Sequence, residues 1–263
     1  MIDTSLLLTD EEYKAKFEGN HPTPYIYHLA KGQQVLFNFG VRHSRKPDDP
    51  QWEELAREWN EFLSAANDKR MVLFEGSRLL APEGDRDATI LKFGESGVLV
   101  LLAKSSGASF DWPDPTFKEE VAFLKQNFDT DAVAYFFFAR SAGSWLRAGT
   151  MGTFDEVIRK AADAGRRIPG APTDVSAYAT IHERIFGKPL GYDQQETIIR
   201  ASAPVYHDSV INDIARADSR FRNERIVLKA EKYWNDGYSI FMLFGTAHAV
   251  IQEPALRALV NGS

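Results

Sequence analysis

The fold is constrained most strongly by three short apolar runs, residues 35–39, 71–74 and 238–244, which predict buried β-strands. The run at 71–74 is apolar at every position, which is typical of a strand in a sheet covered on both faces. The first and last runs lie near opposite ends of the chain, and helical patterns dominate between them. This order predicts an α/β fold, a layered single domain over residues 1–263 with helices flanking a central sheet.

Helical periodicity and capping residues fill the interval between the predicted strands. Asp114 and Pro115 are typical of a helix start, with the aspartate as the cap and the proline in the first turn. Residues 111–200 are mainly helical in pattern, and we expect this segment to form a cap over a cleft. Two further helices are predicted near residues 206–217 and 218–234, before the last strand.

Composition excludes several classes of protein. Lysine plus arginine number 31 and aspartate plus glutamate 37, a net charge of −6, which argues against a protein dedicated to nucleic acid or anionic membranes. The absence of cysteine excludes disulfides, thiolate metal sites and cysteine nucleophiles. The apolar run at residues 6–8 is too short for an export signal, and no stretch approaches the ~20 apolar residues of a membrane span. A cytoplasmic location is expected.

Two histidines share one local setting, an apolar strand followed by a Gly-x-x-His motif. These motifs run from Gly40 to His43 and from Gly245 to His248. The glycine is expected to let the backbone leave the strand sharply, so that each histidine lies beyond the strand's carboxyl end. That edge is where open α/β sheets bind ligands. If the two strands are neighbours, both histidines face one crevice; otherwise they bond loop carbonyls at a sheet edge.

Three charged residues could complete such a site. Glu75 directly follows the strand at 71–74, and a carboxylate placed there needs a partner. It could be a general base, a metal ligand, an orienting group for a histidine, or simply a loop carboxylate. Glu95 begins an apolar helix, and its position alone favours a carboxylate that interacts with the helix dipole. Arg222 lies on a charged helix, and its pattern alone favours a solvated face.

Several well-known catalytic motifs are missing. The sequence has no Gly-x-Ser-x-Gly elbow, no His-Glu-x-x-His helix, no Walker loop and no dinucleotide fingerprint. A serine hydrolase of the α/β-hydrolase type is therefore disfavoured, and nucleotide binding has no support. His182 and the aromatic run at residues 135–138 fall on apolar helical stripes, so we expect both in the core.

Taken in order, these residues resemble the TraB/TIKI and erythromycin-esterase-like (haem-binding-uptake/Tiki) superfamily. The matching motifs are Gly40-Val41-Arg42-His43, Phe74-Glu75-Gly76, Gly94-Glu95, Arg222-Asn223 and Gly245-Thr246-Ala247-His248. The closest stretch is residues 218–250, whereas residues 110–200 are hardly covered. The resemblance implies a mixed central sheet, with an active cleft at the strand carboxyl ends.

The resemblance also implies hydrolase chemistry on an ester, lactone or peptide bond. Some branches are metal-dependent peptidases, others cleave esters without metal, and further relatives bind ligands or regulate. We predict that one histidine takes the proton of a water molecule while Arg222 stabilises the oxyanion. Arg42 and Asn223 are predicted to contact the substrate. The predicted catalytic residues are His43, Glu75, Glu95, Arg222 and His248.

Two questions stay open in this sequence: whether the site holds a metal ion, and whether the protein is an enzyme or a non-catalytic binding protein. His43, Glu75 and His248 could bind a divalent ion, although Arg222 in the same site would repel a cation and suits a metal-free site. The partner would be a small molecule or a peptide. The alternative to a hydrolase is a non-catalytic protein that binds a small ligand or peptide in the same cleft. The sequence leaves the substrate and the oligomeric state open.

Overall fold

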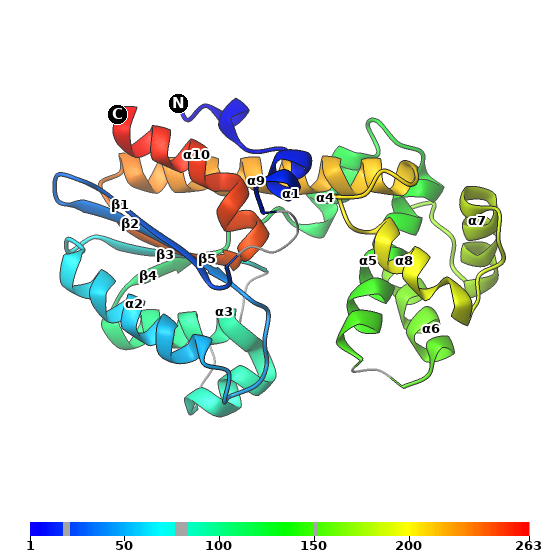
Figure 1. Ribbon diagram of the computed structural model, residues 1–263, viewed down its shortest axis with the longest axis horizontal. Coiled ribbons are helices and arrows are strands. Elements are labelled where there is room, and N and C mark those ends of the chain that lie inside the picture. The colour runs from blue at the N-terminus through cyan, green and yellow to red at the C-terminus, as the bar shows by residue number, and fades with distance from the viewer. Residues whose placement is uncertain (18–21, 77–83, 150–151, 263) are drawn as a thin grey trace. The chain divides into compact units, whose positions relative to one another are not determined.

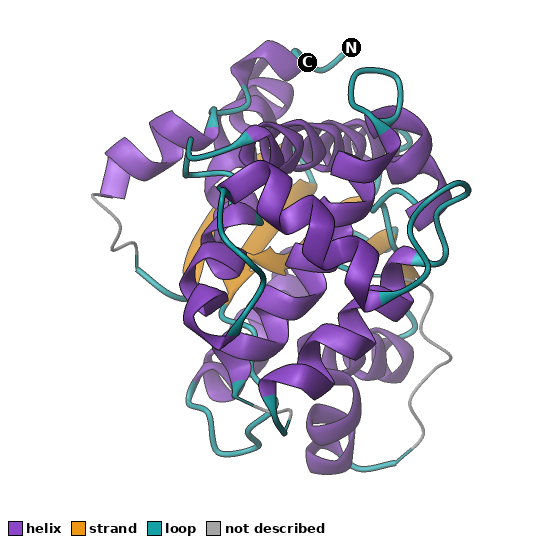
Figure 2. Cartoon of the chain, turned by 90° about the vertical axis from the view of Figure 1, so that its right-hand side faces the viewer, coloured by secondary structure: helices purple, strands orange, loops and turns teal. Residues whose placement is uncertain are grey.

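The computed structural model confirms the α/β fold class (Figure 1). It describes all residues except 18–21, 77–83, 150–151 and 263. Helices make up most of the described chain (Figure 2). No helix in the described chain combines the length and the apolar character needed to cross a membrane. Two compact units are present, one formed by Met1–Asp114 with Arg222–Ser263 and the other by Pro115–Phe221.

The first unit contains a mixed five-stranded sheet in the order β1-β2-β5-β3-β4. The strands are β1 (Tyr25–Lys31), β2 (Gln34–Val41), β3 (Arg70–Phe74), β4 (Ser109–Asp111) and β5 (Ser239–Gly245). β1 pairs antiparallel with β2 and is an addition to the predicted strands, while all other pairs are parallel. β5 lies between β2 and β3, so the carboxyl ends of these three strands meet at one edge.

Helices cover both faces of this sheet, because successive strand side chains point to opposite sides. The helices of the unit are α1 (Asp10–Phe17), α2 (Gln51–Ala65), α3 (Arg86–Ser106), the carboxyl-terminal part of α9 (Val210–Asn235) and α10 (Thr246–Gly262). Phe39, Val72 and Phe241 pack under α2 and α3. Leu73 and Met242 face the other way, toward α9 and α10. Side chains on both faces of these strands are buried, as the uninterrupted apolar run at residues 71–74 predicts, and this burial anchors the edge that carries the candidate site.

The second unit is helical in its described residues. Its helices are α4 (Phe117–Leu124), α5 (Thr130–Ala148), α6 (Phe154–Gly165), α7 (Val175–Phe186) and α8 (Gln195–Ala201), with the amino-terminal part of α9. The aromatic run Tyr135 to Phe138 on α5 is buried, as predicted. His182 is also buried, and its Nδ1 lies 2.6 Å from the Tyr135 hydroxyl. The core assignment of both is confirmed.

Two predicted helix boundaries are wrong. Asp114 does not cap α4; Thr116 does, in a capping box with Glu119. The helices predicted at 206–217 and 218–234 are one helix, α9, because the junction contains neither glycine nor proline to end it. The Asp218 carboxylate accepts a hydrogen bond from Arg140 Nη1 at 2.9 Å and does not cap a new helix.

Candidate functional site

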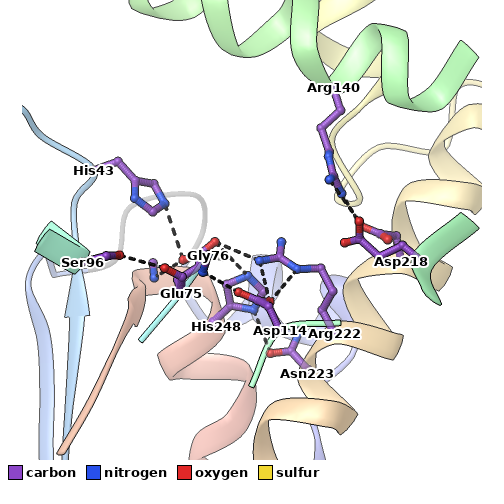
Figure 3. A network of polar contacts seen from close by, with 12 residues as sticks. His43, Glu75, Gly76, Ser96, Asp114, Arg140, Asp218, Arg222, Asn223 and His248 are labelled. Atoms are coloured by element: carbon purple, nitrogen blue, oxygen red, sulfur yellow. Dashed lines mark hydrogen bonds and ion pairs between the residues drawn. The ribbon is translucent and has the colours of Figure 1, made fainter. Parts of the chain in front are cut away.

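The candidate site lies at the carboxyl edge of β2, β5 and β3 (Figure 3). β2 leads to His43, β3 leads to Glu75, and β5 leads through the first turn of α10 to His248. The Nε2 atom of His43 lies 3.8 Å from Glu75 Oε2, and the Nε2 atom of His248 lies 3.7 Å from Glu75 Oε1. Parallel pairing of β5 with both neighbours thus places one carboxylate between the two histidines.

Hydrogen bonds fix Glu75 in this position. Its Oε1 atom accepts from Arg222 Nη2 at 3.0 Å, and its Oε2 atom accepts from the Gly245 backbone N–H at 2.8 Å. The Ser96 hydroxyl donates to the Glu75 backbone carbonyl at 2.8 Å. Both carboxylate oxygens therefore have a donor supplied by another element of the fold.

The surroundings of Glu75 keep its carboxyl group ionised. Burial alone would raise the pKa of Glu75, since a buried charge loses its hydration. At the low pH where this carboxyl would take up a proton both histidines are charged, and the positive charges of His248, Arg222 and His43, followed by the Gly245 N–H, hold the pKa of Glu75 well below its ordinary value. Glu75 is therefore an ionised carboxylate that balances the charge of its cationic neighbours. It carries no proton and cannot serve as the proton donor.

His43 is held as an imidazolium by Glu95. Its Nδ1 atom forms a short hydrogen bond with Glu95 Oε1. That bond is the main reason that the pKa of His43 is raised to about 9. Gly94, with φ of 62°, kinks α3 immediately before Glu95, so a new helical stretch begins at this carboxylate as the sequence predicts. The His43 side chain is 63% exposed and reachable from solvent.

His248 has the opposite environment. Its Nδ1 atom lies 2.9 Å from Asn223 Oδ1, which also accepts a hydrogen bond from Gln252 Nε2 at 2.8 Å. Because an amide oxygen only accepts, Nδ1 of His248 carries the hydrogen and its Nε2 is the basic atom of the neutral ring. Burial lowers the pKa of His248, so the ring is neutral at neutral pH.

Asp114 belongs to this cluster and was missed as a site residue by the sequence reasoning. Its Oδ1 atom accepts from Arg222 Nε at 3.0 Å, and its Oδ2 atom accepts from the Gly76 N–H at 2.7 Å. Asp114 lies a short distance beyond the end of β4, whereas Glu75 lies directly beyond the end of β3. Its position after a strand was the available signal, but the adjacent Pro115 favoured the helix-cap interpretation. Arg222 thus donates hydrogen bonds to two carboxylates, those of Asp114 and Glu75.

The two motif glycines are required because a side chain would not fit at either position. The predicted reason, a sharp backbone turn that needs glycine, is wrong. Neither has a left-handed φ. A Cβ atom at Gly245 would lie 2.9 Å from His43 Nε2 and 3.2 Å from Glu75 Oε2. A Cβ atom at Gly40 would lie 2.9 Å from the Cβ atom of Ala249 on α10. The missing side chain at Gly40 leaves room for α10 against the sheet, and the missing side chain at Gly245 leaves room for His43 and Glu75.

The structure brings together five of the predicted site residues and places two others differently. Glu75 contacts His43, Arg222 and His248 directly, and Glu95 joins through His43. Arg42 is not part of the cluster: its side chain is 62% exposed and its Nη2 atom pairs with Asp49 at 2.9 Å.

Asn223 lies behind His248 within the first unit. Its side chain is 1% exposed, and its carboxamide oxygen is occupied by His248 and Gln252. This position lets Asn223 orient the histidine ring and fix its tautomer.

The donor set fits a metal ion poorly. Within the described chain, no group of three or more histidine, cysteine, aspartate or glutamate side chains is arranged to hold one. Of the predicted ligands, Glu75 has its two oxygens occupied by Arg222 and Gly245. A guanidinium group 3.0 Å from that carboxylate would repel a cation bound there.

Comparisons with protein-family models, curated proteins and solved structures found no match. The resemblance to the TraB/TIKI and erythromycin-esterase-like superfamily therefore stays a prediction that rests on the motifs. The geometry supplies its own chemical argument, since one neutral and one protonated histidine flank the same carboxylate. Such a pair can accept a proton and donate another at the same pH.

Proposed function

We propose that this protein is a hydrolase that cleaves an ester, lactone or peptide bond without a metal ion. The observation that carries the proposal is the pairing of the two motif histidines across Glu75 in opposite protonation states. His248 is the general base and His43 the general acid. The proposed family membership in the TraB/TIKI and erythromycin-esterase-like superfamily agrees with this chemistry.

In the proposed reaction, neutral His248 takes a proton from water through Nε2 as the water oxygen attacks the carbonyl carbon. The new C–O bond forms while the carbonyl electrons move onto oxygen. The intermediate then expels its alcohol or amine, which takes a proton from the His43 imidazolium. Proton exchange with solvent afterwards returns each histidine to its starting state. Glu75 stays ionised, and its charge stabilises the imidazolium that forms at His248.

Arg222 supplies fixed positive charge beside the reacting groups. Its guanidinium contacts Glu75 and Asp114 at 3.0 and 2.9 Å, so its orientation is set before the substrate arrives. Preorganised charge of this kind stabilises a developing oxyanion, because no reorganisation is needed during the reaction. Asp114 and Asn223 are positioning residues in this proposal, the first for Arg222 and the second for His248.

The test is a hydrolysis screen with esters, lactones and short peptides, using protein treated with a chelator. We expect turnover that survives chelation and is lost in the His43→Ala/His248→Ala double variant. Activity that disappears on chelation and returns with a divalent ion would replace the proposal by a metal-dependent one. Tight ligand binding without turnover, abolished in the same double variant, would establish the non-catalytic binder instead.

A further inference from the structure

A pocket lies wholly within the unit Pro115–Phe221, between α4 and the segment that follows α6. Its volume is about 650 Å³, within the range of roughly 300–1,000 Å³ typical of small-molecule sites. The lining residues are Thr116, Phe117, Lys118, Val121, Ala122, Lys125, Arg167 and Pro169. None of them belongs to the histidine cluster of the first unit, so the pocket needs an explanation of its own.

The wall of this pocket is apolar and anchored in the core. Phe117 and Val121 stand one helical turn apart on α4, so their side chains share a face. The Phe117 ring packs against Phe137 of α5 with centroids 4.8 Å apart, and Val121 is buried. Ala122 adds a small, exposed side chain beside them. A ligand in this pocket would meet a rigid hydrocarbon surface.

The rim of the pocket is cationic. Lys118, Lys125 and Arg167 line it, and no acidic side chain among the described residues does. Within the described chain none of these three cations forms an ion pair, whereas Arg140 and Arg184 of the same unit pair with aspartates. In a protein with a net charge of −6, three uncompensated cations around one apolar pocket favour an anionic ligand.

Two of these cations are held at the mouth of the pocket. The Arg167 guanidinium lies over the Phe117 ring, 4.4 Å from its centroid, in a cation–π contact. The Lys125 ammonium donates one hydrogen bond to the Pro169 carbonyl at 3.1 Å. An ammonium has three N–H donors and a guanidinium five, so both groups keep donors for a carboxylate.

We propose that this pocket binds a fatty carboxylate, with its hydrocarbon chain against Phe117 and Val121 and its carboxylate between Lys125 and Arg167. Hydrocarbon burial supplies the affinity, and the cationic rim selects the anionic headgroup. The proposal is independent of the hydrolase chemistry, because none of the lining residues takes part in it.

Calorimetric titration of the protein with decanoate, kept below its micelle concentration, tests the ligand class. Decanol has the same chain without the charge, and decyltrimethylammonium has the opposite charge. We expect decanoate to bind at least tenfold more tightly than decanol, and decyltrimethylammonium to bind more weakly still. Equal affinities for decanoate and decanol, or no decanoate binding at millimolar concentration, would overturn the proposal.

Variants then locate the site. The Lys125→Ala/Arg167→Ala variant should weaken decanoate binding about tenfold or more and leave decanol binding unchanged. Ala122→Trp should weaken both by filling the pocket. Lys160→Ala removes an exposed cation of the same unit outside the pocket and should change neither. If the double variant does not melt cooperatively, Lys118→Ala replaces it, with an expected smaller loss for decanoate alone. Decanoate binding unaffected by these rim substitutions would show that the pocket is not its site.

Discussion

His43 and His248 occupy the same position in two copies of one motif and flank the same carboxylate, yet they differ in burial and in the hydrogen-bond partner at Nδ1. His43 is exposed and bonded to a carboxylate, so its pKa is raised to about 9. His248 is bonded to an amide and largely enclosed, and this burial lowers its pKa. The motif therefore sets where a histidine lies, whereas the carboxylate at Nδ1 of His43 and the burial of His248 set their protonation states.

The largest expected effects come from removing each histidine in turn. His248→Ala and His43→Ala should each lower kcat by roughly 10²–10⁴-fold, the usual contribution of a general acid or base. Their pH profiles should differ: His248→Ala loses the acidic limb of kcat, and His43→Ala loses the alkaline limb. The measurement is kcat against pH for both variants, with thermal melting as the check on folding. Loss of the same limb in both variants would break the comparison.

The two motif glycines should separate stability from activity. Gly40→Ala places a Cβ atom 2.9 Å from the Cβ atom of Ala249 and should cost roughly 1–3 kcal/mol in free energy of unfolding. Gly245→Ala displaces His43 and Glu75, and should lower kcat roughly 10–100-fold through misplacement of reacting groups. Urea denaturation and kcat measured on both variants test this division. Similar losses of kcat in the two variants would show that Gly245 has no special place in the site.

Glu95→Gln should have a smaller effect, a change in the pKa of His43 and in the pH dependence of stability. It tests whether the Glu95 carboxylate causes the difference in pKa between the two histidines. Without the carboxylate, the pKa of His43 should fall from about 9 toward its ordinary value of 6.5. The folded protein holds this proton more tightly than the unfolded chain, so the stabilisation is full below pH 6.5 and disappears as pH rises through about 9. The wild type should therefore lose stability over this window more steeply than the variant.

The measurements are an NMR titration of the His43 ring and urea denaturation at both ends of that window. His248→Ala serves as the control, because it removes the other histidine and leaves Glu95 in place. An unchanged His43 titration in Glu95→Gln would mean that another group sets the pKa of His43.

The smallest effect should follow from Arg42→Ala, although Arg42 directly precedes His43. Its exposed guanidinium pairs with the Asp49 carboxylate, which keeps the Gln51 N–H as a donor, so its loss should cost about 1 kcal/mol in free energy of unfolding. Both kcat and KM should stay close to the wild-type values. A large rise in KM would instead show that Arg42 contacts the substrate, as the sequence interpretation holds. Steady-state kinetics on Arg42→Ala decides between the two.

Much of the fold could be predicted because its signals are local. The apolar runs that form β2, β3 and β5 predict buried strands, because their side chains must be removed from water whatever the order of the strands in the sheet. The two Gly-x-x-His motifs likewise place their histidines just beyond β2 and β5. The buried run at Tyr135 to Phe138 needed no tertiary information either.

Other features were decided only by contacts between distant segments. Sequence alone leaves the strand order open, and it is the insertion of β5 between β2 and β3 that brings His43, Glu75 and His248 together. Asp114 joins the site because Arg222, far along the chain, lies beside it. The protonation states of the histidines depend on burial and on hydrogen-bond partners from other helices. A one-dimensional pattern records which groups can ionise, but the pKa of each depends on the charges and solvent that folding places around it.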